Sequence, residues 1–250
     1  MATLLINPSR LLRAERLPLE TDPARWRLRD LVGLVVVFGL AYGAVMGTFG
    51  GFGCDRSLQV VYSAVKVPLL LLATFAISLP SFFVFNTLLG VRGDFPQAVR
   101  ALAATQAVLV IVLASLAPLT AVWYASSGHY DRAILFNAAM FAVASAAAQA
   151  VLRRLYGPLI ARDARHRRLL RAWLIVYAFV GIQMGWVLRP FIGRPGSEAE
   201  FFRDGAWGNA YVEVAKKGWS SFRGERRNAR PVKREDVKRE ATPAAGTRAK

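Results

Sequence analysis

Long runs of apolar residues without charge dominate this chain, and they predict helices that cross a membrane. The first run lies between Asp30 and Asp55 and is uncharged for about one bilayer thickness. At 1.5 Å per residue, about 20 helical residues cross a hydrocarbon core of about 30 Å. The five predicted spans are residues 31–49, 67–89, 101–124, 133–152 and 172–188. They predict an all-α, polytopic transmembrane helix bundle.

Three more polar segments flank the predicted membrane domain of residues 31–190. Residues 1–30 form a basic N-terminal arm, either solvated or folded from Ser9 to Arg16 into a short amphipathic helix on the membrane surface. Residues 191–219 mix aromatic, glycine and charged residues and are too polar to span, so we expect them at the interface. Residues 220–250 are charged with few apolar residues, which predicts a disordered basic tail.

Small residues recur at four-residue spacing and predict close helix packing. In lipid, small residues let two helix backbones approach closely, and the resulting dispersion contact drives association. The positions are Gly39, Gly43, Gly47 and Gly51 in the first span, Ala138, Ala142, Ala146 and Ala150 in the fourth, and Gly181 and Gly185 in the fifth. We expect the glycine stripe to pack on the alanine stripe within one chain. A contact with a second copy, or room for a lipid or ligand, is the alternative.

Basic residues are distributed unevenly between the two sides of the predicted spans. With the N-terminus in the cytoplasm, the inner segments carry fifteen arginines and the outer connections carry three basic residues. The positive-inside rule therefore favours a cytoplasmic N-terminus. Five spans then place the C-terminus outside, together with its basic tail; an even number of spans, with the tail inside, is the alternative. The Ala- and Arg-rich, Lys-poor composition indicates a bacterial protein of the inner membrane.

The basic residues also suggest binding partners. The net charge of +17 would be typical of a nucleic-acid-binding protein, but here the charge flanks apolar runs or lies in the tail. Anionic lipid headgroups or the carboxylates of another membrane protein are therefore the expected partners, and nucleic acid is not. The candidate lipid- or partner-binding residues are Arg153, Arg154, Arg167, Arg168, Arg189, Arg194 and Arg203. In the simpler interpretation Arg189 anchors the end of the fifth span.

Little in the sequence indicates catalysis or metal binding. There is one cysteine, Cys54, and we expect His129 and His166 in loops on opposite sides of the membrane. Asp163 and His166 are interpreted as a surface pair, and Lys66 as a residue that reaches the headgroups. The sequence thus predicts no catalytic residue, no metal ligand and no cofactor. The neutral amides within the spans, expected to pair between helices, include Asn86, Gln106, Asn137 and Gln183.

Two stretches resemble known membrane proteins. Two apolar helices joined by the connector Leu89–Ala98, and followed by a helix with Pro118 near its end, resemble the Yip1-type family of five-helix membrane proteins over residues 64–124. That resemblance implies a non-enzymatic protein that recruits or arranges other proteins. The segment Trp186–Gly193, together with residues 201–203 and 207–209, resembles a recurrent stretch of uncharacterised bacterial membrane proteins, which implies no function.

Three functions are compatible with these observations. The first expectation is a non-catalytic integral membrane protein that organises or recruits other proteins, with self-association as one form of that role. The second is a small transporter or a permease subunit. A proton- or ion-coupled pump is disfavoured because none of the five predicted span cores contains an ionisable residue. The third, an intramembrane enzyme, has no motif to support it.

Overall fold

The computed structural model describes residues 27–50, 57–193, 201–202 and 212. The chain divides into two compact units, Met1–Ala210 and Tyr211–Lys250, and every helix named below belongs to the first. The predictions for Gly51, Arg194, Arg203, the basic tail and most of the N-terminal arm lie outside the described residues. So does most of the interfacial segment predicted over residues 191–219.

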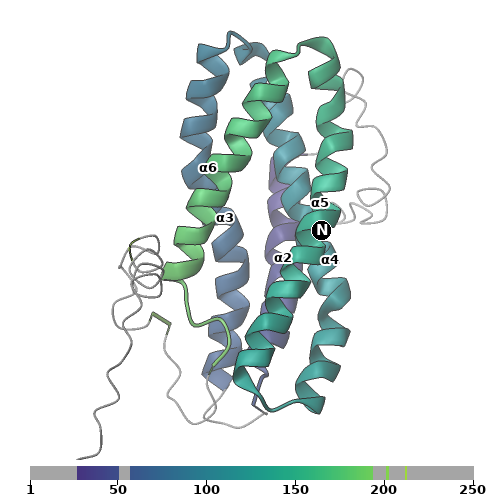
Figure 1. Ribbon diagram of the computed structural model, residues 1–250, viewed down its shortest axis with the longest axis vertical. Helices are drawn as coiled ribbons and strands as arrows, with labels where there is room; N and C mark the ends of the chain where they lie inside the picture. Colours follow the sequence, from purple (N-terminus) through teal and green to yellow (C-terminus); the bar gives the residue numbers. More distant parts are fainter. Residues whose placement is uncertain (1–26, 51–56, 194–200, 203–211, 213–250) are drawn as a thin grey trace, which may run out of the picture. The chain divides into compact units, whose positions relative to one another are not determined.

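Within the described residues, five helices are long and apolar enough to cross a membrane, which confirms the predicted all-α bundle (Figure 1). They are α2 (Leu28–Gly47), α3 (Ser57–Leu88), α4 (Phe95–Ser126), α5 (Tyr130–Arg162) and α6 (Arg165–Val187). A 3₁₀-helix, η2 (Arg92–Asp94), joins α3 to α4. Gly90, at φ +71°, supplies the left-handed residue that follows the end of α3.

Three helices are longer than the spans that hydropathy predicts. α3 and α4 each have 32 residues and α5 has 33, so each is about 50 Å long against a hydrocarbon core of about 30 Å. Hydropathy detects only the apolar part of a helix. Backbone hydrogen bonding continues beyond that part until a residue stops it, and α3 runs uninterrupted through both Pro68 and Pro80.

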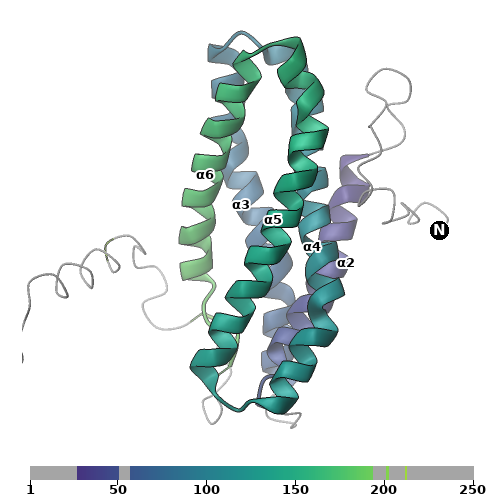
Figure 2. The same ribbon diagram turned by 45° about the vertical axis from the view of Figure 1, so that its right-hand side comes forward.

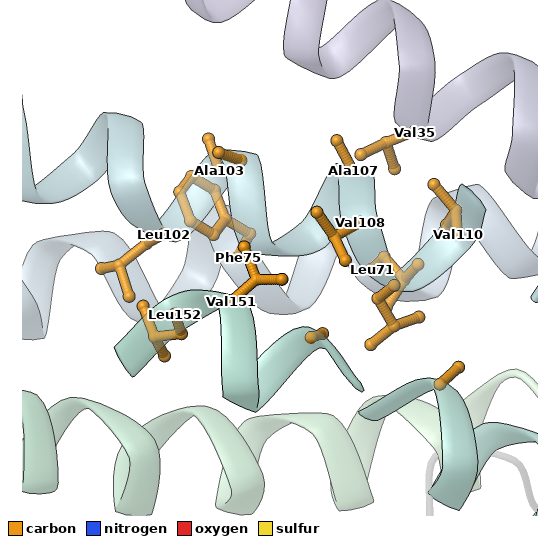
Figure 3. Close-up of a cluster of buried hydrophobic side chains, with 14 of the residues drawn as sticks. Val35, Leu71, Phe75, Leu102, Ala103, Ala107, Val108, Val110, Val151 and Leu152 are labelled. Atoms are coloured by element: carbon orange, nitrogen blue, oxygen red, sulfur yellow. The ribbon is translucent and has the colours of Figure 1, made fainter. Parts of the chain in front are cut away.

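α4 is the central helix of the bundle. Every residue from Ala101 to Ile111 is buried, and α4 packs against α2 on one side and α5 on another. Figure 3 shows side chains of four helices meeting there, among them Val35 of α2, Phe75 of α3, Val108 of α4 and Leu152 of α5. Within the described residues the core is thus a continuous set of aliphatic and aromatic side chains.

α6 is the most peripheral span. The most apolar window of α6 is 17% buried, against 61% for that of α4. α6 packs chiefly on α3 and touches α5 much less, and the two ribbons diverge away from the turn that joins them (Figure 2). α2 is in close contact with α3, from Gly39 beside Pro68 to Gly47 beside Val60.

Candidate functional site

The glycine stripe of α2 lies against α3, where the two backbones touch. A Cβ atom added at Gly43 would lie 2.8 Å from the Cα of Ala64, and one at Gly47 would lie 2.5 Å from the Cα of Val60. At Gly39 the nearest atoms belong to Pro68. Three glycines of the predicted packing set thus meet α3 of the same chain. The expected partner was the alanine stripe, and this pairing is corrected: tertiary packing places α3, not α5, across from the glycines.

The alanine stripe of α5 faces away from the bundle. Ala138, Ala142, Ala146 and Ala150 are all exposed. The buried face of α5 is shifted by one to two residues and includes Ala133, Asn137, Met140, Ala144 and Ala148. Because α5 is alanine-rich on both faces, spacing alone does not identify which stripe is inside. In the fifth span, Gly181 lies near Thr74 of α3, whereas Gly185 has open space around it.

An ionic cluster built around the buried His166 joins three elements at the end of the bundle that carries the α5–α6 turn. Asp94 of η2 contacts His166 of α6 through Oδ2 at 3.0 Å and accepts a hydrogen bond from Arg162 of α5 through Oδ1 at 3.2 Å. The ring of His166 is fully buried, and its Nδ1 lies 3.5 Å from the hydroxyl of Tyr156. His166 therefore belongs to a helix and pairs with Asp94, which corrects its placement in a loop beside Asp163.

Asp163 instead organises the α5–α6 turn locally. Its Oδ1 accepts the backbone N–H of Arg165 at 2.8 Å, and the Arg165 side chain contacts Oδ2 at 2.9 Å. The backbone hydrogen bond, aided by the guanidinium charge, lowers the pKa of Asp163 below its ordinary value. A carboxylate with a lowered pKa stabilises the folded turn at neutral pH. That contribution is lost as the pH falls through the folded pKa.

The arginines of this end lie at different depths along the helices. Asp94 gives a common reference, because α4 begins directly after it and its carboxylate contacts Arg162 of α5 and His166 of α6. We call the position of Asp94 along the bundle the Asp94 level. At 1.5 Å per residue, Arg100 of α4 and Arg171 of α6 lie about 8 Å from the Asp94 level, and Arg154 and Arg153 of α5 lie about 12–14 Å from it. Arg167 and Arg168 lie only about 2–3 Å from that level. All six side chains are exposed, and no ion pair joins any of them to another described residue.

Arg189 lies near the opposite end of the bundle. Its guanidinium carbon stacks 3.5 Å from the centre of the Trp186 ring. The predicted arginine set is therefore divided: Arg153, Arg154, Arg167 and Arg168 share one end, and Arg189 is separate from them. Stacking on an aromatic ring is a common use of the planar guanidinium group.

The segment that follows α6 folds against α3 and α5 as a non-helical strap, which we define as residues 188–193. Three successive carbonyl groups of the strap accept hydrogen bonds from side chains. Lys66 Nζ donates to Pro190 at 2.7 Å, Ser63 Oγ to Phe191 at 2.5 Å and the Tyr130 hydroxyl to Ile192 at 3.3 Å. Non-helical backbone at membrane depth is tolerated when protein groups satisfy it in this way.

Lys66 is fully buried within α3 rather than directed to the headgroups, which corrects the sequence-based prediction. Besides the Pro190 carbonyl, its ammonium group lies 5.1 Å from the centre of the Phe201 ring. Sequence reasoning missed this because the apolar run begins at Val67, directly after Lys66. The available signal was the stretch from Ser57 to Lys66, which has no proline or glycine and could extend the helix backwards.

The neutral amides of the spans do not meet at one point. The side-chain carbonyl of Asn137 accepts a hydrogen bond from Tyr42 of α2 at 3.1 Å, and its amide group donates to Tyr124 of α4. Gln106 of α4 accepts a hydrogen bond from Tyr177 of α6 at 2.9 Å. Asn86 is a separate buried residue of α3.

The described residues include no group of three or more His, Cys, Asp or Glu side chains placed to hold a metal ion.

These features define the class of the protein. Five apolar spans, a bundle joined by short turns and side-chain hydrogen bonds that link the spans are the properties of a multi-pass α-helical membrane protein. No protein-family model, no curated protein and no solved structure matches the chain. The resemblance of residues 64–124 to Yip1-type proteins therefore stays a prediction.

Proposed function

We propose that the protein is a non-catalytic membrane protein that binds and organises other membrane proteins in the inner membrane of a bacterium. The observation that carries this proposal is the exposed alanine face of α5, formed by Ala138, Ala142, Ala146 and Ala150. In lipid, a face of small residues allows another helix to approach closely. No helix among the described residues uses this face, so it is available to a second membrane protein or a second copy.

The interior supports the same role. The polar side chains of the spans are used to join helices, as in the Tyr42–Asn137–Tyr124 contacts across α2, α5 and α4. α4 is buried without interruption from Ala101 to Ile111 by aliphatic, aromatic and small residues. A bundle whose polar side chains join its helices, and which exposes a face of alanines, is suited to assembly rather than to chemistry.

The test is affinity purification of the full chain from mild detergent, comparing wild type with two variants. Ala142→Ile combined with Ala146→Ile places branched side chains on the alanine face. Val143→Ile changes an exposed neighbour and is the matched control. We expect the co-purifying proteins, or the second copy, to be lost from the alanine variant and kept with the control. A protein that purifies alone, or the same partners in all three samples, would contradict the proposal.

A second candidate function, a small-solute permease, is favoured by Lys66 and the strap. A buried ammonium group within a span, beside non-helical backbone, is typical of substrate pathways in transporters. The distinguishing measurement is solute uptake by vesicles containing the purified full chain. Uptake by the wild type that is lost in Lys66→Met would favour the permease over the organising role.

A further inference from the structure

The arginines at the α5–α6 end lie at different distances from the membrane surface. The position of that surface follows from the length of α2 and its place in the bundle. Gly39 of α2 lies beside Pro68 of α3. Counting residues from that contact places the start of α2 about 14 Å from the Asp94 level, and α2 is itself about 30 Å long. The length of α2 therefore matches about one hydrocarbon core, and its first turn, which carries Arg29 and Asp30, marks the cytoplasmic boundary.

Four exposed arginines lie at or just beyond this boundary. We define them as the arginine belt: Arg100, Arg153, Arg154 and Arg171. Their depths of about 8–14 Å from the Asp94 level place them in the headgroup layer, which is about 5–7 Å thick on each side of the core. Arg167 and Arg168 lie about 11 Å beyond the boundary, outside that layer.

The carboxylates near the belt are already engaged. Asp30 is paired with Arg29, Asp94 with Arg162 and His166, and Asp163 with Arg165. The belt arginines therefore have no acidic partner among the described residues, and they occur on three different helices. A planar guanidinium group binds a phosphate through two parallel hydrogen bonds, so the partner that fits this position and charge is a phosphate in the headgroup layer.

We propose that the arginine belt binds the headgroups of anionic phospholipids in the cytoplasmic leaflet. The ionic cluster of Asp94, Arg162 and His166 holds the ends of α5 and α6 to η2, and it thereby keeps the belt residues of these helices within the depth of the headgroup layer. This inference does not depend on the organising function proposed above, because a permease would present the same belt.

The experiment measures binding of a soluble short-chain phosphatidylglycerol to the detergent-purified full chain by isothermal titration calorimetry. Short-chain phosphatidylcholine, inorganic phosphate and a short DNA duplex are titrated in parallel. Two double variants remove the same charge at different depths. The belt variant is Arg154→Gln with Arg171→Gln, and the outer variant is Arg167→Gln with Arg168→Gln, which lie beyond the headgroup layer. All four residues are exposed, and thermal unfolding of each variant checks that the bundle is retained.

At about 1 kcal/mol per arginine near the surface, the belt variant should weaken phosphatidylglycerol binding roughly 30-fold. The variant at Arg167 and Arg168 should weaken phosphatidylglycerol binding by less than about 3-fold, because these two residues lie outside the headgroup layer. Equal losses in the two variants would show a response to total charge and overturn the proposal. Equal affinity for phosphatidylcholine, for inorganic phosphate or for DNA would overturn it as well. If the belt variant unfolds, Arg154→Gln and Arg171→Gln are tested singly.

Discussion

At the scale of single residues, Gly43 is required by distance rather than by backbone conformation. Its φ angle is an ordinary helical one, but the α3 backbone lies where a side chain would stand. Gly33, on the same helix, has nothing within 4 Å of an added Cβ. Spacing places Gly43 in the glycine stripe and leaves Gly33 outside it, and the position of α3 gives the physical reason why only Gly43 is required.

Gly43→Ala should therefore destabilise the bundle. The added methyl group forces α2 and α3 apart, and overpacking of this kind costs about 1–3 kcal/mol. Gly33→Ala is the matched control and should be neutral or slightly stabilising, because alanine is the better helix former by about 1 kcal/mol. Thermal unfolding in detergent measures both. Equal midpoints for the two variants would argue against a backbone contact at Gly43.

Asp94 is the second residue whose importance depends on tertiary structure. It is one of two charged residues in the connector Leu89–Ala98, and it joins η2 to α5 and α6 through Arg162 and His166. His166 lies 72 residues away in the chain, whereas Asp163 lies only three residues from it. Closeness in the sequence therefore led to Asp163, instead of Asp94, as the predicted partner of His166.

Asp94→Asn should loosen the α5–α6 end. The change leaves the buried His166 ring without its charged acceptor, which costs about 1–3 kcal/mol. Asp131→Asn removes an exposed carboxylate at the other end of α5 and is the control. Limited proteolysis at the α5–α6 turn, together with thermal unfolding, provides the measurement. We expect faster cleavage only in Asp94→Asn; unchanged cleavage would mean that the cluster does not hold the helices together.

At the scale of elements, α6 and the strap together complete one crossing. α6 ends at Val187, about 31 Å from the Asp94 level, which is well short of the outer end of α2 at about 44 Å. The strap covers the remaining depth, and Gly193 reaches the side chain of Gln59 near the start of α3. Lys66 lies within this depth and donates to the Pro190 carbonyl of the strap. The strap is not helical, so its carbonyl groups need donors from outside the strap.

Lys66→Met should release the strap from α3. The substitution keeps the volume of the side chain and removes the donor to the Pro190 carbonyl. A single thiol introduced as Ile192→Cys in a Cys54→Ala background reports exposure, because Ile192 is 4% exposed. We expect thiol labelling to be several-fold faster with Lys66→Met. Gly128→Cys, in the exposed α4–α5 turn, should label equally in both backgrounds; an unchanged rate at Ile192 would show that Lys66 does not hold the strap.

At the scale of the whole molecule, the described turns alternate between the two ends of the bundle. The α5–α6 turn and η2 lie at the arginine-rich end, and the α4–α5 turn lies at the other (Figure 2). The positive-inside rule then predicts that the arginine-rich end is cytoplasmic. A chain that starts α2 at this end and has five spans finishes outside.

Thiol labelling tests this orientation. Ala164→Cys in the α5–α6 turn and Gly128→Cys in the α4–α5 turn are each introduced into the Cys54→Ala background. A membrane-impermeant reagent should label Gly128→Cys in right-side-out vesicles and Ala164→Cys only in inside-out vesicles. A reporter at the C-terminus should be active outside. The reverse labelling pattern would invert the proposed orientation, and a reporter active in the cytoplasm would contradict the five-span topology.

The sequence by itself determined the class of fold and the five spans found among the described residues. Charge-free runs of about 20 residues have few alternatives to membrane-spanning helices, because only a helix or a closed barrel satisfies the backbone in lipid. Arginine counts likewise led to an orientation, which the labelling experiment tests. These are properties of composition along the chain, and they do not depend on which helices become neighbours.

Only the tertiary structure decided which faces meet. It placed α3 against the α2 glycines, turned the α5 alanine stripe outward, paired His166 with Asp94 and buried Lys66 beneath the strap. In lipid the hydrophobic effect does not distinguish an inner helix face from an outer one, because both are apolar. Packing, hydrogen bonds and ion pairs between distant residues make that choice.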